Sequence, residues 1–220
     1  MKEIIISYLI NYFSIILGGI IYVNCKIGSI DEYVSNFAVY LVLIIYIITI
    51  LFLYQKNKRT EKHIKLFSIF PFFSLGISIA IIINMVIFKV YPANEGFDFS
   101  LLLLFSSGII GPIYEEILFR YVLFYRLKKR FSRHLAIFLD VIIFGIIHFS
   151  PIKVIYAMIV GLFLVISYDK YQSILYPIAM HIGANCIVLF LYKFNLTILF
   201  LAIINFIINI YLIFYKTKTS

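Results

Sequence analysis

Residues 111–120 read GPIYEEILFR. The stretch places Glu115, Glu116 and Arg120 inside an apolar run, 100–125, whose length and composition predict a helix that crosses a membrane. Each charged side chain near the middle of a span costs about 2.5–3.5 kcal/mol on insertion scales. Three such charges in one span predict that they pair with other groups and that they serve a function.

The rest of the chain also has the composition of a membrane protein. Its 220 residues are 64% hydrophobic and 13% charged, whereas soluble domains are roughly 45–50% apolar. A helix of about 20 apolar residues crosses the hydrocarbon layer and satisfies its own backbone hydrogen bonds. We therefore predict an all-α polytopic membrane protein of about eight transmembrane helices with an intramembrane active site. The expected spans are 4–23, 33–54, 66–90, 100–125, 135–150, 154–168, 174–192 and 195–215.

The basic residues predict how the chain is oriented in a cell membrane. The net charge is +9, but Lys and Arg cluster at span ends and form no single basic face, so we expect no nucleic-acid partner. With eight spans, fourteen Lys and Arg residues fall on one side and four on the other. The positive-inside rule places the richer side in the cytoplasm, and with it both termini. We expect a multi-pass protein surrounded by the lipid bilayer.

The distribution of ionisable groups predicts three parts of the chain. The first three spans carry only scattered Ser, Asn and Thr, whereas buried ionisable groups begin with the fourth span. We therefore expect an N-terminal scaffold of three helices over 1–99, a catalytic core over 100–192, and a last helix with a cytoplasmic tail over 193–220. The two cysteines, Cys25 and Cys186, form no pattern that predicts a disulfide framework or a metal site.

Helical spacing predicts how the three charges of the quoted stretch are used. Residues four apart lie on one face of a helix, so Glu116 and Arg120 are expected to form a supporting ion pair. Glu115 lies about 100° around the same helix and needs partners from other spans. Gly111 and Pro112 precede the carboxylates and are expected to break or kink the helix.

Two later spans supply polar side chains at a matching depth. The stretch FGIIHF contains Phe144 and His148 one turn apart, and HIGAN contains His181 and Asn185 one turn apart. Counted at 1.5 Å per residue from the predicted cytoplasmic ends, these side chains and Glu115 lie about 10–21 Å into the membrane. We expect Glu115, His148, His181 and Asn185 to meet there. Asp140 is expected to make a polar contact with another helix.

This set of residues predicts hydrolysis by an activated water molecule. A carboxylate beside a histidine can deprotonate water, and a second histidine with an amide donor can stabilise an oxyanion. Glu115, His148 and His181 could alternatively hold Zn²⁺ with one open position for water, although the sequence contains no HExxH motif. Both the zinc-dependent and the metal-free mechanism remain open at this point.

The three motifs resemble those of a known family. EEILFR (115–120) matches EExxxR, FGIIH (144–148) matches FxxxH, and HIGAN (181–185) matches HxxxN, in the family's order. The chain is similar to the CPBP family, the CAAX-protease and bacteriocin-processing intramembrane peptidases also called Abi proteins.

The resemblance implies roles for individual residues. Glu115 and His148 would activate water, His181 and Asn185 would bind the oxyanion or help to hold a metal, and the remaining motif residues would support them: Glu116, Arg120 and Phe144. It implies an endopeptidase that acts on a membrane-associated or lipidated peptide or protein. In bacteria, members of the family are associated with peptide maturation and bacteriocin self-immunity.

Two other classes of protein could carry the same residues. A non-catalytic immunity or scaffold protein on the peptidase fold would retain them and act by binding. A secondary transporter would also place carboxylates in mid-membrane, but it would favour paired repeats, and the ionisable groups of this chain cluster in one half. Replacement of Glu115 by Gln distinguishes an enzyme, which it inactivates, from a binding protein, which it spares.

Overall fold

The computed structural model describes residues 2, 4–10, 12–14, 17, 32–60, 66–90, 104–148, 150–188, 191 and 195–215. Within these ranges all regular secondary structure is helical, which confirms the predicted all-α class. The chain divides into two compact units, Met1–Lys58 and Arg59–Ser220. In the first unit the main element is α2 (Glu32–Lys56), which matches the span predicted at 33–54.

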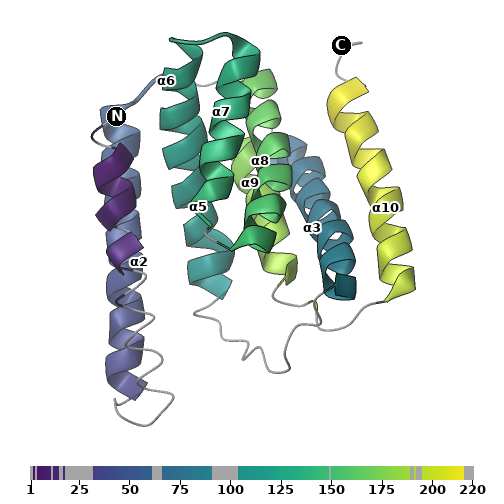
Figure 1. Ribbon diagram of the computed structural model, residues 1–220, viewed down its shortest axis with the longest axis horizontal. Coiled ribbons are helices and arrows are strands. Elements are labelled where there is room, and N and C mark those ends of the chain that lie inside the picture. Colours follow the sequence, from purple (N-terminus) through teal and green to yellow (C-terminus); the bar gives the residue numbers. More distant parts are fainter. Residues whose placement is uncertain are drawn as a thin grey trace. The chain divides into compact units, whose positions relative to one another are not determined.

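The second unit contains all the motif residues. Its elements are η1 (Leu66–Ile69), α3 (Phe70–Val90), η2 (Leu104–Ile110), α5 (Gly111–Glu116), η3 (Ile117–Phe124), α6 (Tyr125–Lys128), α7 (Arg133–Ile146), α8 (Pro151–Tyr171), α9 (Leu175–Val188), α10 (Leu196–Ile210) and η4 (Tyr211–Tyr215). Of the η elements, η1 is a 3₁₀-helix and the other three are π-helical. Figure 1 shows the long helices running up and down, so that the turn between α6 and α7 lies at the opposite end of the unit from the turn between α7 and α8.

Three helical stretches of the described residues are long and apolar enough to cross a membrane: Phe67–Met85, Pro151–Tyr171 and Leu196–Tyr215. They coincide with three predicted spans and support a location in a membrane. The predicted spans at 135–150 and 174–192 correspond to α7 and α9, which have 14 residues each. At 1.5 Å per residue such a helix is about 21 Å long, less than the hydrocarbon thickness of about 30 Å. The span predicted at 4–23 is described only at residues 4–10, 12–14 and 17, and the number of eight spans stays a prediction.

Small residues bring α3 and α9 into backbone contact. A Cβ atom added at Gly76 of α3 would lie 1.9 Å from the backbone oxygen of Met180, and one added at Gly183 of α9 would lie 2.2 Å from that of Phe73. No side chain fits in either place. Close approach of helices through small residues is typical of membrane proteins, where packing must replace the hydrophobic effect between helices.

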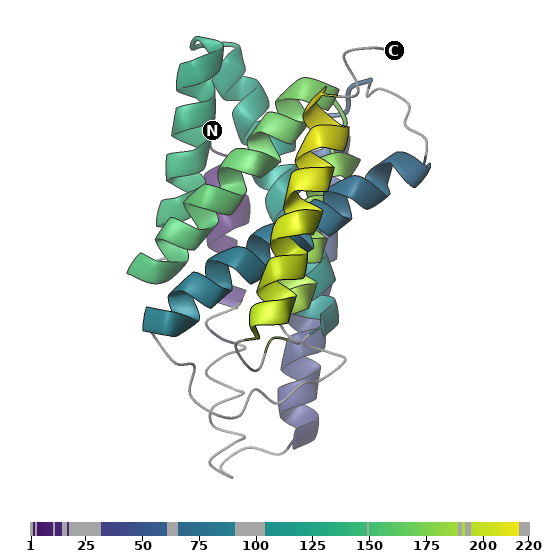
Figure 2. The same cartoon turned by 90° about the vertical axis from the view of Figure 1, so that its right-hand side faces the viewer.

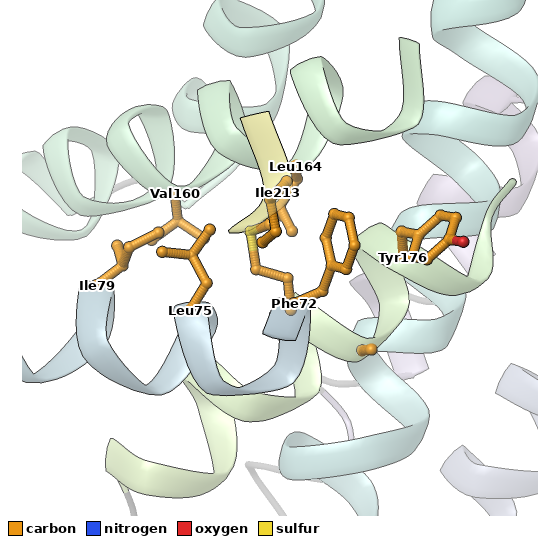
Figure 3. Close-up of a cluster of buried hydrophobic side chains, with 9 residues drawn as sticks. Phe72, Leu75, Ile79, Val160, Leu164, Tyr176 and Ile213 are labelled. Carbon is orange, nitrogen blue, oxygen red and sulfur yellow. The ribbon is translucent and has the colours of Figure 1, made fainter. Parts of the chain in front are cut away.

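The apolar core of the second unit lies where α3, α8, α9 and η4 meet. Figure 3 shows Leu75 and Ile79 of α3 facing Val160 of α8, with Phe72 and Tyr176 beside them. The rings of Phe72 and Tyr176 have centroids 4.4 Å apart. Since α9 carries two motif residues, this core fixes the helix that presents them.

Polar side chains join α3 to α10 across their interface. The amide nitrogen of Asn205 donates to Ser78 Oγ at 2.5 Å and to Ser74 Oγ at 2.9 Å, and that of Asn209 donates to Ser74 Oγ at 3.3 Å. Figure 2 shows α3 crossing α10 obliquely at this interface. Helices from the predicted scaffold, core and tail thus pack together. The predicted boundaries themselves, at 99/100 and 192/193, lie outside the described residues.

The helix that carries the quoted stretch changes its hydrogen bonding twice. α5 lies between the π-helical elements η2 and η3, and it begins at Gly111 with Pro112 in its first turn. The preceding residue, Ile110, keeps helical dihedral angles of −70° and −41°. The expected break is therefore replaced by a change from π- to α-helical bonding, which suits a proline because its nitrogen has no hydrogen to donate. Single π-turns recur near functional sites.

We predict that Gly76→Ala and Gly183→Ala each destabilise the protein by about 1–3 kcal/mol, because the new methyl group meets a backbone carbonyl that can move only with its helix. The measurement is thermal unfolding of the purified protein in detergent, followed by circular dichroism. Gly145→Ala is the matched control, since its new methyl group first meets the flexible side chain of Met158, and a smaller loss is expected. Equal losses in all three variants would contradict the backbone contact.

Candidate active site

A fully buried ion pair forms the centre of the site. Glu116, at the end of α5, accepts a hydrogen bond of 3.1 Å from Arg120 of η3, and both side chains are 0% exposed. The ion pair predicted from their spacing is thus present. Glu116 and Arg120 are one turn apart on a single helix, so each orients the other without a contribution from another helix.

Arg120 connects this helix to α7 and α8. Its Nη2 donates to the backbone oxygen of Gly161 in α8 at 3.2 Å, and its Nε lies 3.6 Å from an Asp140 oxygen in α7. Its guanidinium carbon stands 4.1 Å from the centroid of the Phe144 ring. Asp140 is fully buried, and its predicted polar contact with another helix is present. One arginine therefore holds three helices together.

His181 of α9 joins the same group from the other side. Its Nδ1 lies 2.7 Å from Glu116 Oε1, and its Nε2 lies 3.7 Å from Glu115 Oε2. Because a carboxylate accepts, Nδ1 carries the hydrogen and donates to Glu116. In the neutral imidazole Nε2 is then free to accept a proton, and it faces Glu115.

The two neighbouring carboxylates have different surroundings. The side chain of Glu115 is 27% exposed, whereas that of Glu116 is 0% exposed. Glu115 is also too far from His181 for a direct hydrogen bond, at 3.7 Å. A single water molecule can bridge such a distance. Of the two, Glu115 is the carboxylate that a reactant can reach.

His148 lies just after the end of α7 and is oriented by its own helix. Its Nδ1 donates to the backbone oxygen of Phe144 at 2.9 Å, which leaves Nε2 as the acceptor in the neutral ring. The Phe144 ring lies edge-on to both histidines, with centroid distances of 5.2 Å to His148 and 5.9 Å to His181. Phe144 thus contacts both histidines, while among the described residues no hydrogen bond or ion pair joins His148 to Glu115, His181 or Asn185.

Asn185 lies one turn beyond His181 on α9. Its Nδ2 donates to the backbone oxygen of Ser107 in η2 at 3.0 Å, and the next residue, Cys186, approaches the oxygen of Gly108. Asn185 therefore contacts the π-helical element that precedes the two carboxylates. An amide nitrogen has two hydrogens, so one remains for a further acceptor.

A metal ion requires several ligating side chains grouped around one point. Among the described residues, no three side chains of His, Cys, Asp or Glu are grouped so that they could hold one ion. Glu115 and His181 are neighbours, while the contacts of His148 are with Phe144, whose ring also contacts His181. The zinc site over Glu115, His148 and His181 does not fit this arrangement of side chains, and zinc dependence stays a prediction.

Backbone groups form a part of the site that sequence patterns did not identify. The oxygens of Gly161 and Ser107 accept from Arg120 and Asn185, yet any residue type carries such an oxygen. Gly161 has a steric signal instead, since an added Cβ would lie 2.8 Å from the Phe144 ring and 3.2 Å from Arg120 Nη2. The glycine in the middle of the apolar span 154–168 is the one feature of the sequence that could have indicated this close contact with Arg120.

Comparison with known proteins finds similarity for the segment that carries the motifs. Residues 97–187 match the family model described as type II CAAX prenyl endopeptidase Rce1-like. A Bacillus subtilis (strain 168) protein named "Putative membrane peptidase YdiL" is 31% identical over 87 residues. That match covers 40% of this chain and 36% of the relative, and no solved structure matches.

The matched segment contains every motif residue from Glu115 to Asn185. The family model, the relative and the three motifs point to the same kind of protein. Residues 97–187 are thus similar to type II CAAX prenyl endopeptidases of the Rce1-like family and to a protein named as a membrane peptidase.

Proposed function

We propose that the chain is an intramembrane endopeptidase that hydrolyses a peptide bond of a membrane-associated or lipidated peptide or protein. The observation that carries this proposal is the contrast between the two adjacent carboxylates. Glu116 is buried in an ion pair, while Glu115 is partly exposed beside the Nε2 atom of His181. A carboxylate that is reachable and close to an imidazole acceptor suits the activation of water.

In the proposed mechanism Glu115 and His148 remove the proton from the attacking water. The hydrogen bond from His148 Nδ1 to its own helix leaves Nε2 as a base, and Glu115 supplies the second acceptor. The water then attacks the carbonyl carbon of the scissile bond, and the proton passes to the leaving amine. Phe144 holds His148 in place and covers Arg120 with its ring.

His181 and Asn185 are proposed to stabilise the oxyanion. Asn185 retains one amide hydrogen after its bond to Ser107, and this hydrogen is available to the substrate oxygen. His181 already donates through Nδ1 to Glu116, so it can donate a second hydrogen only when its ring is protonated. A neutral His181 would instead accept, through Nε2, a proton that Glu115 has taken from the water.

The proposed substrate class follows from the family and from the apolar character of the chain. The described helices expose many large apolar side chains, as expected for contact with lipid. A substrate that is itself anchored in the bilayer can reach a site between such helices by lateral diffusion. Peptide maturation and bacteriocin self-immunity are the proposed bacterial roles.

We predict that Glu115→Gln and His148→Ala each reduce cleavage by about 10²–10⁴-fold, the usual contribution of a general base. If both residues activate one water, the double variant loses little more than either single variant. Asn185→Ala should lose about 10²–10³-fold, the usual effect of removing one oxyanion donor. The substrate is first identified as a peptide that accumulates uncleaved in membranes of cells carrying Glu115→Gln, and rates are then measured in liposomes.

The same assay includes a chelator with Zn²⁺ add-back, which decides whether the reaction needs metal. Lys153→Gln, at the start of α8 and outside the site, is the control for general effects of charge removal. Full activity of the Glu115→Gln protein would overturn the proposed peptidase mechanism. Multiplicative losses in the double variant would show that Glu115 and His148 act in separate steps.

We predict that Glu116→Gln lowers the free energy of unfolding by up to about 3–5 kcal/mol, because it leaves Arg120 buried without its nearest charged partner. Glu115→Gln should change it by under about 1 kcal/mol, since this side chain is partly exposed and outside the ion pair. Thermal unfolding of both purified variants in detergent provides the measurement. A Glu116→Gln protein as stable as the wild type would remove the supporting role that we assign to the pair.

We predict that both termini and the turn between α6 and α7 face the cytoplasm, because the basic residues concentrate on that side. Reporter fusions at Arg130 and after Ser220 should therefore be cytoplasmic, and a fusion at Glu95 should be external. The readout pairs a reporter active only inside the cell with one active only outside. An external reporter after Ser220 would contradict the proposed orientation.

A further inference from the structure

A small hollow lies at the end of the second unit where α6 and α8 terminate, away from the candidate active site. It has a volume of about 200 Å³. Aromatic and cationic side chains form its wall, with one amide: Phe124, Tyr125, Lys128, Lys129, Tyr168 and Gln172. Tyr125 follows Glu115 by ten residues on one helical run, which places the hollow about 15 Å further along that helix.

Arg59 supports the wall of this hollow from the segment that follows α2. Its guanidinium carbon lies 3.9 Å from the ring centroids of both Tyr121 and Tyr125, and its Nη2 donates to the hydroxyl of Tyr168 at 2.5 Å. Its Nη1 is buried and makes no hydrogen bond within the described part of the chain. The positive charge of Arg59 thus stands directly behind two side chains that line the hollow.

The charges around the hollow do not cancel. Lys128 and Arg133 share the single carboxylate of Asp169, at 2.6 Å and 2.5 Å. Lys129 is exposed and lies 4.4 Å from the Tyr125 ring centroid, and no carboxylate within the described ranges pairs with it. Together with Arg59, four cations therefore face one anion. The hollow carries an excess of positive charge that an anion can neutralise.

The backbone at the rim of the hollow has one unusual residue. Gln172 has a φ angle of 55°, a left-handed conformation that a residue with a side chain rarely adopts. Its side-chain nitrogen donates to the backbone oxygen of Asp169 at 2.6 Å. This conformation ends α8 sharply and keeps Gln172 in the wall of the hollow. A left-handed residue is a common way to end a helix, and the Gln172 N–H donates to the backbone oxygen of Tyr168.

We propose that the hollow binds the phosphate group of an anionic phospholipid from the surrounding membrane. Lysine and arginine form charge-assisted hydrogen bonds with phosphate oxygens, and basic pockets between membrane helices recognise anionic headgroups. Tyrosine and phenylalanine at the end of a membrane helix suit the boundary between headgroups and acyl chains. The volume is below the 300–1,000 Å³ typical of sites for larger ligands, so it admits a headgroup phosphate and excludes a folded peptide.

A direct test compares two adjacent basic residues that are both exposed. Lys129 lines the hollow, whereas Arg130 is the next residue and does not. The full-length protein is placed in phosphatidylcholine nanodiscs containing 10% phosphatidylglycerol, and bound lipid is counted by native mass spectrometry. Lys129→Gln should reduce phosphatidylglycerol retention about five-fold, which corresponds to about 1 kcal/mol. Arg130→Gln should reduce it less than about two-fold, and phosphatidylcholine should not be retained.

A second arm distinguishes a lipid from free phosphate. Inorganic phosphate at 10 mM should leave phosphatidylglycerol retention unchanged, because the aromatic wall contributes only to binding of the lipid. Displacement of the lipid by inorganic phosphate would overturn the assignment to phospholipid. Equal losses in Lys129→Gln and Arg130→Gln would also overturn it, since they would indicate attraction to the whole basic surface.

Discussion

The ion pair between Glu116 and Arg120 is the interaction on which the site depends. Both side chains are removed from water, so each needs partners within the protein. Glu116 has them in Arg120 and His181, and Arg120 has them in Glu116, the oxygen of Gly161 and the nearby carboxylate of Asp140. These contacts reach α7, α8 and α9 from one helix. In the interior of this part of the structure, these polar contacts fix the rotation and depth of the helices that they join.

The same ion pair explains why two adjacent glutamates can differ so strongly. Around a helix, neighbouring residues point about 100° apart, so one can face the bundle interior while the other faces an opening. Glu116 is held by the arginine, and it orients the His181 ring through Nδ1. The opposite nitrogen of that ring is then directed at Glu115. The buried carboxylate of Glu116 thus orients the His181 ring toward the more exposed Glu115. Hydrogen-bond partners of histidines commonly act in this way.

The sequence alone predicted the helical class, the ion pair and the similarity to the family model because each depends on local spacing. Charged residues in an apolar run, and motifs five or six residues long, are visible in the sequence itself. The contacts of Asn185 with Ser107 and of Arg120 with Gly161 could not be predicted, because they end on backbone oxygens that every residue carries. The zinc ligands were predicted from residue type, whereas the grouping of their side chains depends on tertiary packing, such as the contacts of the Phe144 ring with His148 and His181. The span count depends on helix length, and α7 and α9 are shorter than the apolar runs that contain them.

The contact between Gly76 and Met180 has a consequence for how such chains can diverge. The segment that matches the family begins at residue 97, after α3, yet α3 lies against the helix that carries His181. A larger residue at position 76 requires a compensating retreat of the α9 backbone near Met180 and Ala184, and one at 183 requires the same near Phe73 and Ile77. These positions are therefore expected to change together among relatives, as residues in spatial contact do. The inherited unit of this protein then extends beyond its recognisable motifs, and a transplanted core would need its own α3.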